Sequence, residues 1–366
     1  MKAMKSVFQL LVLWVTIVTA TLITSACATI TLRGIATAPS ATELPLISTL
    51  PSLPQPTSVA IPLATPIRGA TNLRLWIFHD DNEQALLDAI SSAKQRVLMT
   101  MYLLTDYRFI TALQSAHRNG ADVRVLLEEN PYRGAAAARQ AFDRLTRAGI
   151  NVKHANPEYR FTHQKSLVID NAAVIMTANL TKSAFSSNRD IAVMYSDNTD
   201  VTEMSRTFDA DWNRSPVSQH SATLVWSPGN SRERLGDLIY SANKTIDIYA
   251  EVTQDDGITD LLVQAAQRKV DIRLITSPVQ SSSEDSNKPN LDTLQQHGIS
   301  VRYLRNPYIH AKMILVDGTI SFIGSQNISA TSMEFNRELG VLVADQTVMQ
   351  RLSAVFQKDW QKATVR

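Results

Sequence analysis

Histidine, lysine and aspartate recur at one spacing in two segments of the sequence. Both segments read H-x-K-x4-D, and their members are His163, Lys165 and Asp170 in the first and His310, Lys312 and Asp317 in the second. An apolar, β-branched run follows each lysine, which predicts a strand in which the histidine and the lysine of a pair point the same way. An imidazole can attack an ester or protonate a leaving group, and an ammonium neutralises anionic oxygens. The two segments therefore suit chemistry on an anionic ester.

Further motifs follow each segment. Gly324-Ser325-Gln326-Asn327 comes after the second segment, and Met176-Thr177-Ala178-Asn179 comes after the first with one residue fewer in between. Beyond them, Asn336-Arg337-Glu338 corresponds to Asn188-Arg189-Asp190. The carboxylate of this last motif lies 27 residues after the first histidine and 28 after the second, the same one-residue deficit, which supports the alignment.

With these motifs the chain resembles the phospholipase D superfamily, whose signature is H-x-K-x4-D followed by G-S-x-N. The resemblance covers about residues 70 to 345, and the first copy departs from it at Met176 and Thr177. It implies a phosphodiesterase that works in two steps through a phosphohistidine. It also implies that Asp190 and Glu338, rather than the motif aspartates, orient the catalytic imidazoles.

The resemblance extends to individual roles. It favours His163 as the nucleophile and His310 as the general acid, and the reverse assignment stays open. The groups expected to bind the phosphate oxygens are the two motif lysines together with Asn179, Asn327, Ser325 and Thr177.

Asp170 and Asp317 are expected to be structural and to fix the turn into the next strand. We expect no metal at this centre, because an ammonium beside each imidazole opposes a divalent cation. No cofactor is expected either.

The elements that must position these residues repeat along the chain at a spacing of roughly 147 to 150 residues. Within a half, β-branched runs alternate with helical patterns, such as 82–94, 109–118 ending at Gly120, and a further helix ending at Gly149. This order predicts an α/β fold of two pseudo-symmetric phospholipase D-like halves, 70–215 and 216–366. Each half would be a mixed, mainly β-sheet flanked by helices, with the active site at the interface.

The N-terminal region has a different composition. Lys2 and Lys5 precede an apolar stretch, and Ser25-Ala26 leads into Cys27, so residues 1–27 resemble a signal peptide with a lipobox in which Cys27 carries the lipid. A plain signal peptide or an uncleaved anchor are the alternatives. Residues 28–69 are rich in Pro, Ser and Thr and predict a tether. The protein would be exported and held at the outer face of the membrane.

Glu251 and three aromatic residues have two explanations each. Glu251 follows a predicted strand where active-site loops usually emerge, but a solvated carboxylate explains it equally well, so it is left out of the predicted site. Tyr159, Phe161 and Tyr308 precede the motifs and line a substrate mouth or pack in the core.

We expect hydrolysis of a phosphodiester, with a phospholipid head group as the natural substrate of a membrane-held protein. The alternatives are an endonuclease of the same superfamily, a phosphatidyltransferase like the cardiolipin synthases, and a non-catalytic phosphate-binding protein. The formal net charge of +2, with no basic stripe, permits nucleic acid as a partner but does not indicate it. Two motifs in one chain remove the need for a dimer, which favours a monomer.

Overall fold

A computed structural model describes residues 67–132, 134–279 and 284–366 of the chain. The predicted signal segment with Cys27, and the predicted tether as far as residue 66, lie outside the described residues. The remaining predictions can be compared with the fold.

The first half of the described chain is built on a mixed sheet. Its seven strands stand in the order β1, β8, β6, β5, β2, β3, β4. In chain order they span Arg74–Ile77 (β1), Arg96–Met101 (β2), Asp122–Leu127 (β3), Asn151–His154 (β4), Lys165–Ile169 (β5), Ala172–Met176 (β6) and Ile191–Tyr195 (β8). β2, β3 and β4 are parallel, and β5 pairs antiparallel with β2. The start of β5 therefore lies at the carboxyl end of β2.

The second sheet repeats this order and adds one strand. Its order is β9, β18, β16, β15, β10, β12, β13, with β19 added at the edge of β13. The strands span Leu224–Ser227 (β9), Thr245–Tyr249 (β10), Asp271–Thr276 (β12), Ser300–Tyr303 (β13), Met313–Val316 (β15), Ile320–Gly324 (β16), Glu338–Val343 (β18) and Thr364–Val365 (β19). The internal repeat predicted from the sequence is thus a repeat of whole sheets.

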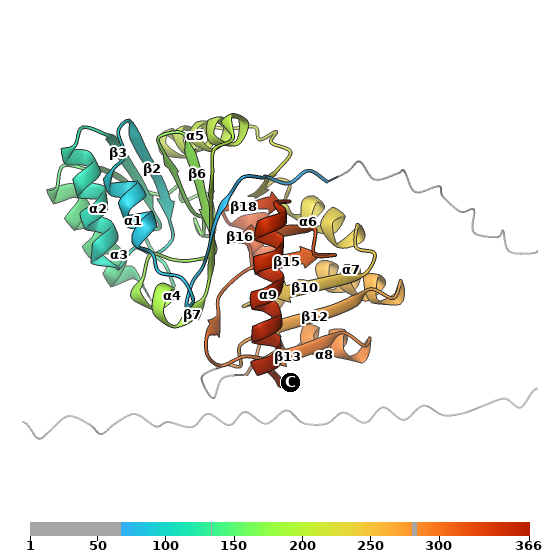
Figure 1. Ribbon diagram of the computed structural model, residues 1–366. Helices are drawn as coiled ribbons and strands as arrows, with labels where there is room; N and C mark the ends of the chain where they lie inside the picture. The colour runs from blue at the N-terminus through green and yellow to red at the C-terminus, as the bar shows by residue number, and fades with distance from the viewer. Residues whose placement is uncertain (1–66, 133, 280–283) are drawn as a thin grey trace, which may run out of the picture. The chain divides into compact units, whose positions relative to one another are not determined.

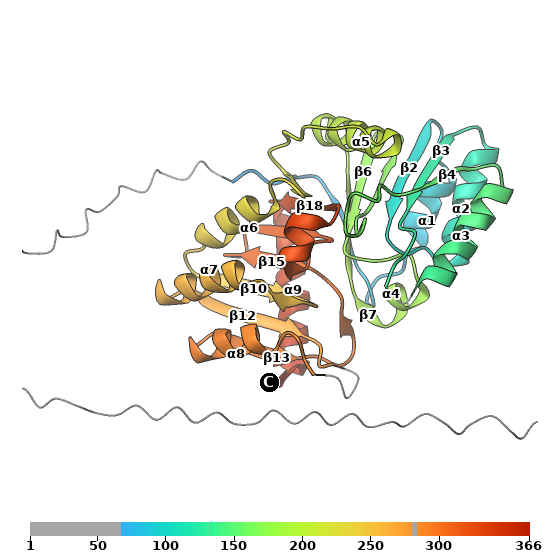
Figure 2. The same ribbon diagram turned by 180° about the vertical axis from the view of Figure 1, so that it is seen from behind.

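Helices cover both faces of each sheet (Figures 1 and 2). On the outer faces lie Gln84–Ser91 (α1), Tyr107–Arg118 (α2) and Ala135–Arg147 (α3), and in the second half Ser231–Tyr240 (α6), Asp256–Gln267 (α7) and Lys288–Gln296 (α8). The inner faces carry Asn198–Asn213 (α5) and Gln346–Lys362 (α9). The predicted fold class and the helices expected between 82 and 150 are confirmed.

Burial on both sides explains why the central strands are apolar at most positions. In β2, Val97 and Met99 belong to the cluster under the outer helices, whereas Leu98 between them belongs to the central cluster. Side chains alternate between the faces of a strand, so a strand that is buried on both sides needs an apolar residue at nearly every position.

The central cluster joins the two halves. It contains residues of both sheets and of α5 and α9, and all described residues belong to one compact unit. The predicted halves are therefore two parts of one folded body, and the boundary between residues 215 and 216 stays a prediction.

Short strands of one half also pair with short strands of the other. Asn188–Arg189 (β7) pairs with Tyr308–Ile309 (β14), and Thr162 forms a bridge with Arg337. A further short pair, Thr253–Gln254 (β11) with Ile328–Ser329 (β17), and two short helical segments, Lys182–Ser186 (α4) and the π-helical turn Thr331–Phe335, complete the elements. In the part of the chain that is described, no helix has both the length and the apolar character needed to cross a bilayer.

The two motif aspartates fix a different segment from the one predicted. Asp170 has a φ of 50° and its carboxylate accepts the backbone N–H groups of Lys94, Gln95 and Arg96, ahead of β2. Asp317 has a φ of 52° and does the same ahead of β10. Each aspartate therefore holds the backbone just before a neighbouring strand, β2 or β10, and not only the turn that follows its own strand. Burial would raise the pKa of Asp170, but the three N–H donors lower it.

We predict that Asp170→Ala lowers the free energy of unfolding by about 2 kcal/mol, because three backbone donors lose a charged acceptor. Asp170→Asn should cost less, since asparagine keeps one acceptor oxygen and tolerates a positive φ. Urea unfolding of the three proteins measures the difference. Equal stability of all three proteins would show that the hydrogen bonds from the carboxylate to the residues before β2 do not stabilise the fold.

Candidate active site

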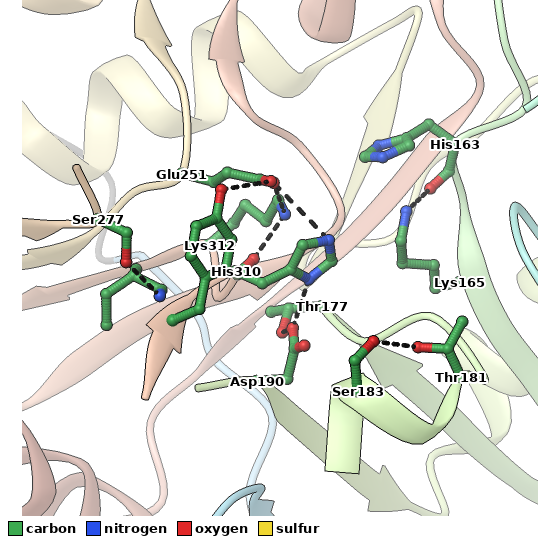
Figure 3. A network of polar contacts seen from close by, with 12 residues as sticks. His163, Lys165, Thr177, Thr181, Ser183, Asp190, Glu251, Ser277, His310 and Lys312 are labelled. Atoms are coloured by element: carbon green, nitrogen blue, oxygen red, sulfur yellow. Dashed lines mark hydrogen bonds and ion pairs between the residues drawn. The ribbon is translucent and has the colours of Figure 1, made fainter. Parts of the chain in front are cut away.

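Each motif histidine is paired with a carboxylate from the other half of the protein. His163 Nδ1 lies 2.8 Å from Glu338 Oε2, and His310 Nδ1 lies 2.8 Å from Asp190 Oδ1. Both carboxylates are fully buried, and the imidazoles are 12–13% exposed. Figure 3 shows His310 with Asp190 below it and His163 and Lys165 nearby. A carboxylate that accepts the Nδ1 proton leaves Nε2 free for chemistry.

The backbone explains how these crossed pairs arise. Gln164 N donates to Arg337 O, and Ala311 N donates to Arg189 O, so each motif is paired with the segment that carries the other half's carboxylate. The sequence predicted that the histidines lie on strands. They instead precede them, because β5 begins at Lys165 and β15 at Met313, and the residues before them pair across the interface.

The arginines next to the two carboxylates form a second crossed set. Arg189 Nε donates to Asp359 of α9 at 2.7 Å, and Arg337 Nη2 donates to Asp211 of α5 at 2.6 Å. All four side chains are at least 92% buried. Sequence reasoning missed these aspartates, although both belong to a repeated F-x-x-D-W pattern at 208–212 and 356–360 that was visible in the chain.

The motif lysines are buried beside the histidines. Lys165 is 0% and Lys312 is 3% exposed, and each Nζ donates to the carbonyl of the histidine two residues earlier at 2.5 Å. Lys312 also donates to Glu251 at 2.8 Å. Among the described residues, Lys165 has no such carboxylate partner, so its charge is the less compensated of the two.

The difference between the lysines comes from one position of the repeat. β2 ends at Met101, opposite Lys165, and is followed by Tyr102; the corresponding position after β10 is Glu251. The Tyr102 ring lies 4.7 Å from the ring of His163 and 5.0 Å from Lys165 Nζ. Glu251 was not predicted as a site residue, because a single carboxylate after a strand is common, and Tyr102 was missed altogether.

Glu251 contacts both members of the second motif. Its Oε2 lies 2.8 Å from Lys312 Nζ and 3.7 Å from His310 Nε2, and its side chain keeps an exposure of 24% (Figure 3). Tyr308 Oη lies 3.5 Å from the other carboxylate oxygen. Of the aromatic residues that precede the motifs, Tyr308 is therefore at the site.

Burial and charge shift the pKa values of the cluster. Burial, against the opposing effect of Glu338, lowers the pKa of His163 to about 4 and the pKa of Lys165 to about 7. Burial would raise the pKa of Glu251, but Lys312 and His310 lower it to about 2. Lys312 adds to the lowering at His163 and His163 to that at Glu251, so charges from the two motifs act on one another.

The two asparagines occupy equivalent, unsatisfied positions. The Oδ1 atoms of Asn179 and Asn327 are buried, and neither side chain makes a hydrogen bond within the described residues. An unpaired buried amide oxygen is costly, so these two equivalent side chains are not held in place by hydrogen bonds of their own. Ile175 pairs with Ser166 and Ile323 pairs with Met313, so β6 and β16 have the same register and the shorter first motif does not take Asn179 out of register with Asn327.

Thr177 and Ser325 do not occupy the phosphate-binding positions that the sequence suggested. Both are 0% exposed. Thr177 Oγ1 donates to Asp190 and accepts from Ile191 N, and Ser325 Oγ accepts from Leu339 N. Their hydroxyls are used to hold the strands of the two carboxylates. Thr177 therefore positions the partner of His310, and both hydroxyls are already bonded within the fold.

Two cavities flank the paired motifs. One, of about 640 Å³, is lined on the second-motif side by Glu251, Tyr308, Asn188, Ser277, Asn287 and Arg305. The other, of about 770 Å³, is lined by the pseudo-equivalent segments, including Tyr159, Arg160, Pro228 and Phe335. Within the described residues, no group of three or more His, Cys, Asp or Glu side chains is arranged to hold a metal ion.

Comparisons with known proteins agree with this geometry. The family model described as "Cardiolipin synthase, PLD-like domain" matches twice, over residues 86–212 and 235–360. The chain is 27% identical over 36% of its length to a mitochondrial cardiolipin hydrolase of Chlamydomonas reinhardtii, covering 57% of that protein. It is 24% identical over 76% of its length to the major cardiolipin synthase of Bacillus subtilis (strain 168), covering 67%.

A solved structure shares the fold. The phosphatidylserine synthase of Haemophilus influenzae Rd KW20 superposes with a TM-score of 0.62 at 11% identity, over 82% of this chain and 88% of that one. The chain spans 57%, 29% and 26% of the length of three of the curated relatives that it matches.

We predict that Arg189→Met or Asp359→Leu alone lowers the free energy of unfolding by about 3–5 kcal/mol, because the remaining charge is buried without its partner. The double variant should lose clearly less than the sum, with a coupling of at least about 1 kcal/mol. Urea unfolding in a double-mutant cycle measures it. The exposed pair Lys288–Asp292 on α8 is the control and should show coupling near zero. Additive losses for the buried pair would contradict a lock between the halves.

Proposed function

Because the chain belongs to the phospholipase D superfamily, we propose that it cleaves a phosphodiester, with a phospholipid as substrate, through a phosphohistidine. The observation that carries the proposal is the crossed arrangement, in which His163 and His310 come from opposite halves and each has its Nδ1 fixed by the other half's carboxylate. Two oriented imidazoles are the requirement for one to attack and the other to donate a proton.

His163 has the properties of the nucleophile. Burial keeps its pKa at about 4, so the imidazole is neutral at neutral pH. Its Nδ1 hydrogen bond to Glu338 leaves the lone pair of Nε2 available for phosphorus, and Glu338 stabilises the positive charge that develops on the ring.

His310 has the surroundings of the general acid. Asp190 lies at its Nδ1 and fixes the orientation of the ring, and Glu251 lies 3.7 Å from its Nε2, so the ring is oriented to pass a proton through Nε2. In the first step the P–O bond breaks, the P–N bond to His163 forms, and the Nε2 proton of His310 goes to the departing alkoxide. The predicted assignment of roles is the one we propose.

Lys165, Lys312 and the two unpaired asparagines neutralise the phosphate. Lys165 is buried and has no carboxylate partner in the described chain, so its Nζ can pair with an incoming phosphate, whose negative charge favours the ammonium form. Asn179 and Asn327 approach from one half each, and their amide N–H groups donate to the phosphate oxygens when the substrate binds.

In the second step a hydroxyl gives its proton to His310 and displaces His163 from phosphorus. Water as this nucleophile gives hydrolysis, and an alcohol gives transfer. Transfer of a phosphatidyl group is the second candidate, favoured by the relatives that are named cardiolipin synthases. The predicted export and lipid attachment through Cys27 would place the site next to phospholipids and are part of the proposal.

We predict that His163→Ala and His310→Ala each lower turnover of the natural diester by roughly 10³-fold or more. The assay uses purified protein in EDTA with phosphatidylcholine, phosphatidylglycerol, cardiolipin or single-stranded DNA, and identifies the products by mass. With a p-nitrophenyl phosphodiester, whose leaving group needs no acid, His310→Ala should still release nitrophenol and accumulate the phosphohistidine. Intact-mass measurement detects this adduct.

The two variants control for one another. His163→Ala should give no adduct with the p-nitrophenyl ester, and an adduct on that variant would show that the roles are reversed. If only DNA gives products, the substrate is nucleic acid and not a phospholipid. Unchanged turnover in both variants would refute catalysis by these histidines.

We also predict that kcat/KM falls as the pH drops through about 4, tenfold per pH unit, because His163 must be deprotonated to attack. His310→Ala assayed with the p-nitrophenyl ester isolates this limb, since no proton donor is needed there. Circular dichroism at each pH shows that the protein is folded. A limb centred near 6.5, the ordinary histidine value, would contradict the effect of burial on His163.

A further inference from the structure

The most informative asymmetry of the site is the carboxylate of Glu251. The two halves place their histidines, lysines and asparagines alike, but Glu251 stands where the first half has Tyr102. A carboxylate inside a site that binds an anion repels phosphate. Its presence is therefore best explained by a contact with another part of the substrate. It lies beside His310 Nε2, the atom that exchanges protons with the alcohol oxygen.

The geometry leaves Glu251 free to accept further hydrogen bonds. A carboxylate offers about four lone-pair sites, and the described side chains near them are Lys312 at 2.8 Å, Tyr308 at 3.5 Å and His310 at 3.7 Å. The side chain is 24% exposed and forms part of the wall of the 640 Å³ cavity. Its low pKa keeps it ionised at neutral pH, so it is a strong acceptor.

The cavity beside Glu251 has the chemistry of an alcohol subsite. Asn188 and Arg305 add an amide and a guanidinium group to its wall, whereas the Ser277 hydroxyl and the Asn287 amide in the same wall are already bonded to backbone groups. At the position of Ser187 in this cavity, the other cavity has Phe335, which is 57% exposed, and it also has Tyr159 and Pro228. The two cavities therefore differ at this position, and the one with Ser187 is the one that Glu251 lines.

We propose that Glu251 selects the alcohol side of the diester: it favours alcohols that carry a second hydrogen-bond donor, a hydroxyl or an ammonium, close to the reacting oxygen. This rests on the proposed function. In the second step the acceptor's O–H proton passes to His310, its oxygen bonds to phosphorus, and the P–N bond to His163 breaks. Glu251 meanwhile accepts the second donor of the same alcohol and holds the reacting oxygen in place.

The test measures how one phosphohistidine is shared between water and added alcohols. The wild-type protein and the variants Glu251→Gln and Glu251→Ala turn over a diester in the presence of glycerol, ethanolamine or 1-propanol at equal concentration. Mass spectrometry gives the ratio of transfer product to hydrolysis product. This ratio does not depend on how fast the intermediate forms.

The wild-type protein should favour glycerol and ethanolamine over 1-propanol by about tenfold, the effect of one hydrogen bond to a charged acceptor. Glu251→Ala should bring the three alcohols to within about twofold. Glu251→Gln, which keeps an acceptor but loses the charge, should keep part of the glycerol preference and lose the ethanolamine preference. This difference separates hydroxyl recognition from ammonium recognition.

The matched control is Tyr102→Phe at the equivalent position of the first half. Whatever it does to the overall rate, it should leave the preference among the alcohols at the wild-type value. If Glu251 only holds Lys312 in place, its variants will lower the rate and leave that preference unchanged, which overturns the inference. A wild-type protein that turns over no diester would instead refute the proposed function, so the two failures are distinct. Thermal unfolding shows which variants are folded. If Glu251→Ala is not folded, the result for Glu251→Gln alone decides between the two outcomes.

Discussion

Buried opposite charges that cross between the halves fix how the two halves fit against one another. Arg189 and Arg337 are each locked by an aspartate of the other half's inner helix, and a buried ion pair tolerates neither partner alone. The residue after each arginine is the carboxylate that orients a histidine of the opposite half. The same few residues therefore join the halves and set the direction of the imidazoles, so the site exists only when the halves are packed together.

The two halves of this symmetric fold surround their motif histidines with different groups and charges. One half places an aromatic ring beside its lysine and histidine, and the other places a carboxylate. The first environment keeps an imidazole neutral by burial, and the second surrounds an imidazole with negative charge. Nucleophilic attack needs a neutral imidazole, and proton donation needs a second imidazole held in a fixed orientation, so the two environments suit two different roles. The difference arises at a single position of the repeat.

The sequence predicted the fold and the motif residues better than it predicted which side chains contact one another. Apolar periodicity and the repeat sufficed for the sheets and helices, and the motifs sufficed for the histidine-lysine pairs and their carboxylates. The crossing could not be predicted, because Asp190 and Glu338 stand at similar distances along the chain from the histidine of their own half. Thr177 and Ser325 were misassigned because spacing does not reveal a hydroxyl that is already bonded. Glu251 was visible, but its partners are distant in sequence.

The fusion of two repeats in one chain has a consequence for how such a site can change. If two identical subunits formed the same arrangement, every substitution would occur on both sides, and a tyrosine on one side with a glutamate on the other would be unattainable. In a single chain the positions of Tyr102 and Glu251 are encoded separately. One side can thus be adapted to the incoming alcohol while the other stays suited to bonding phosphorus.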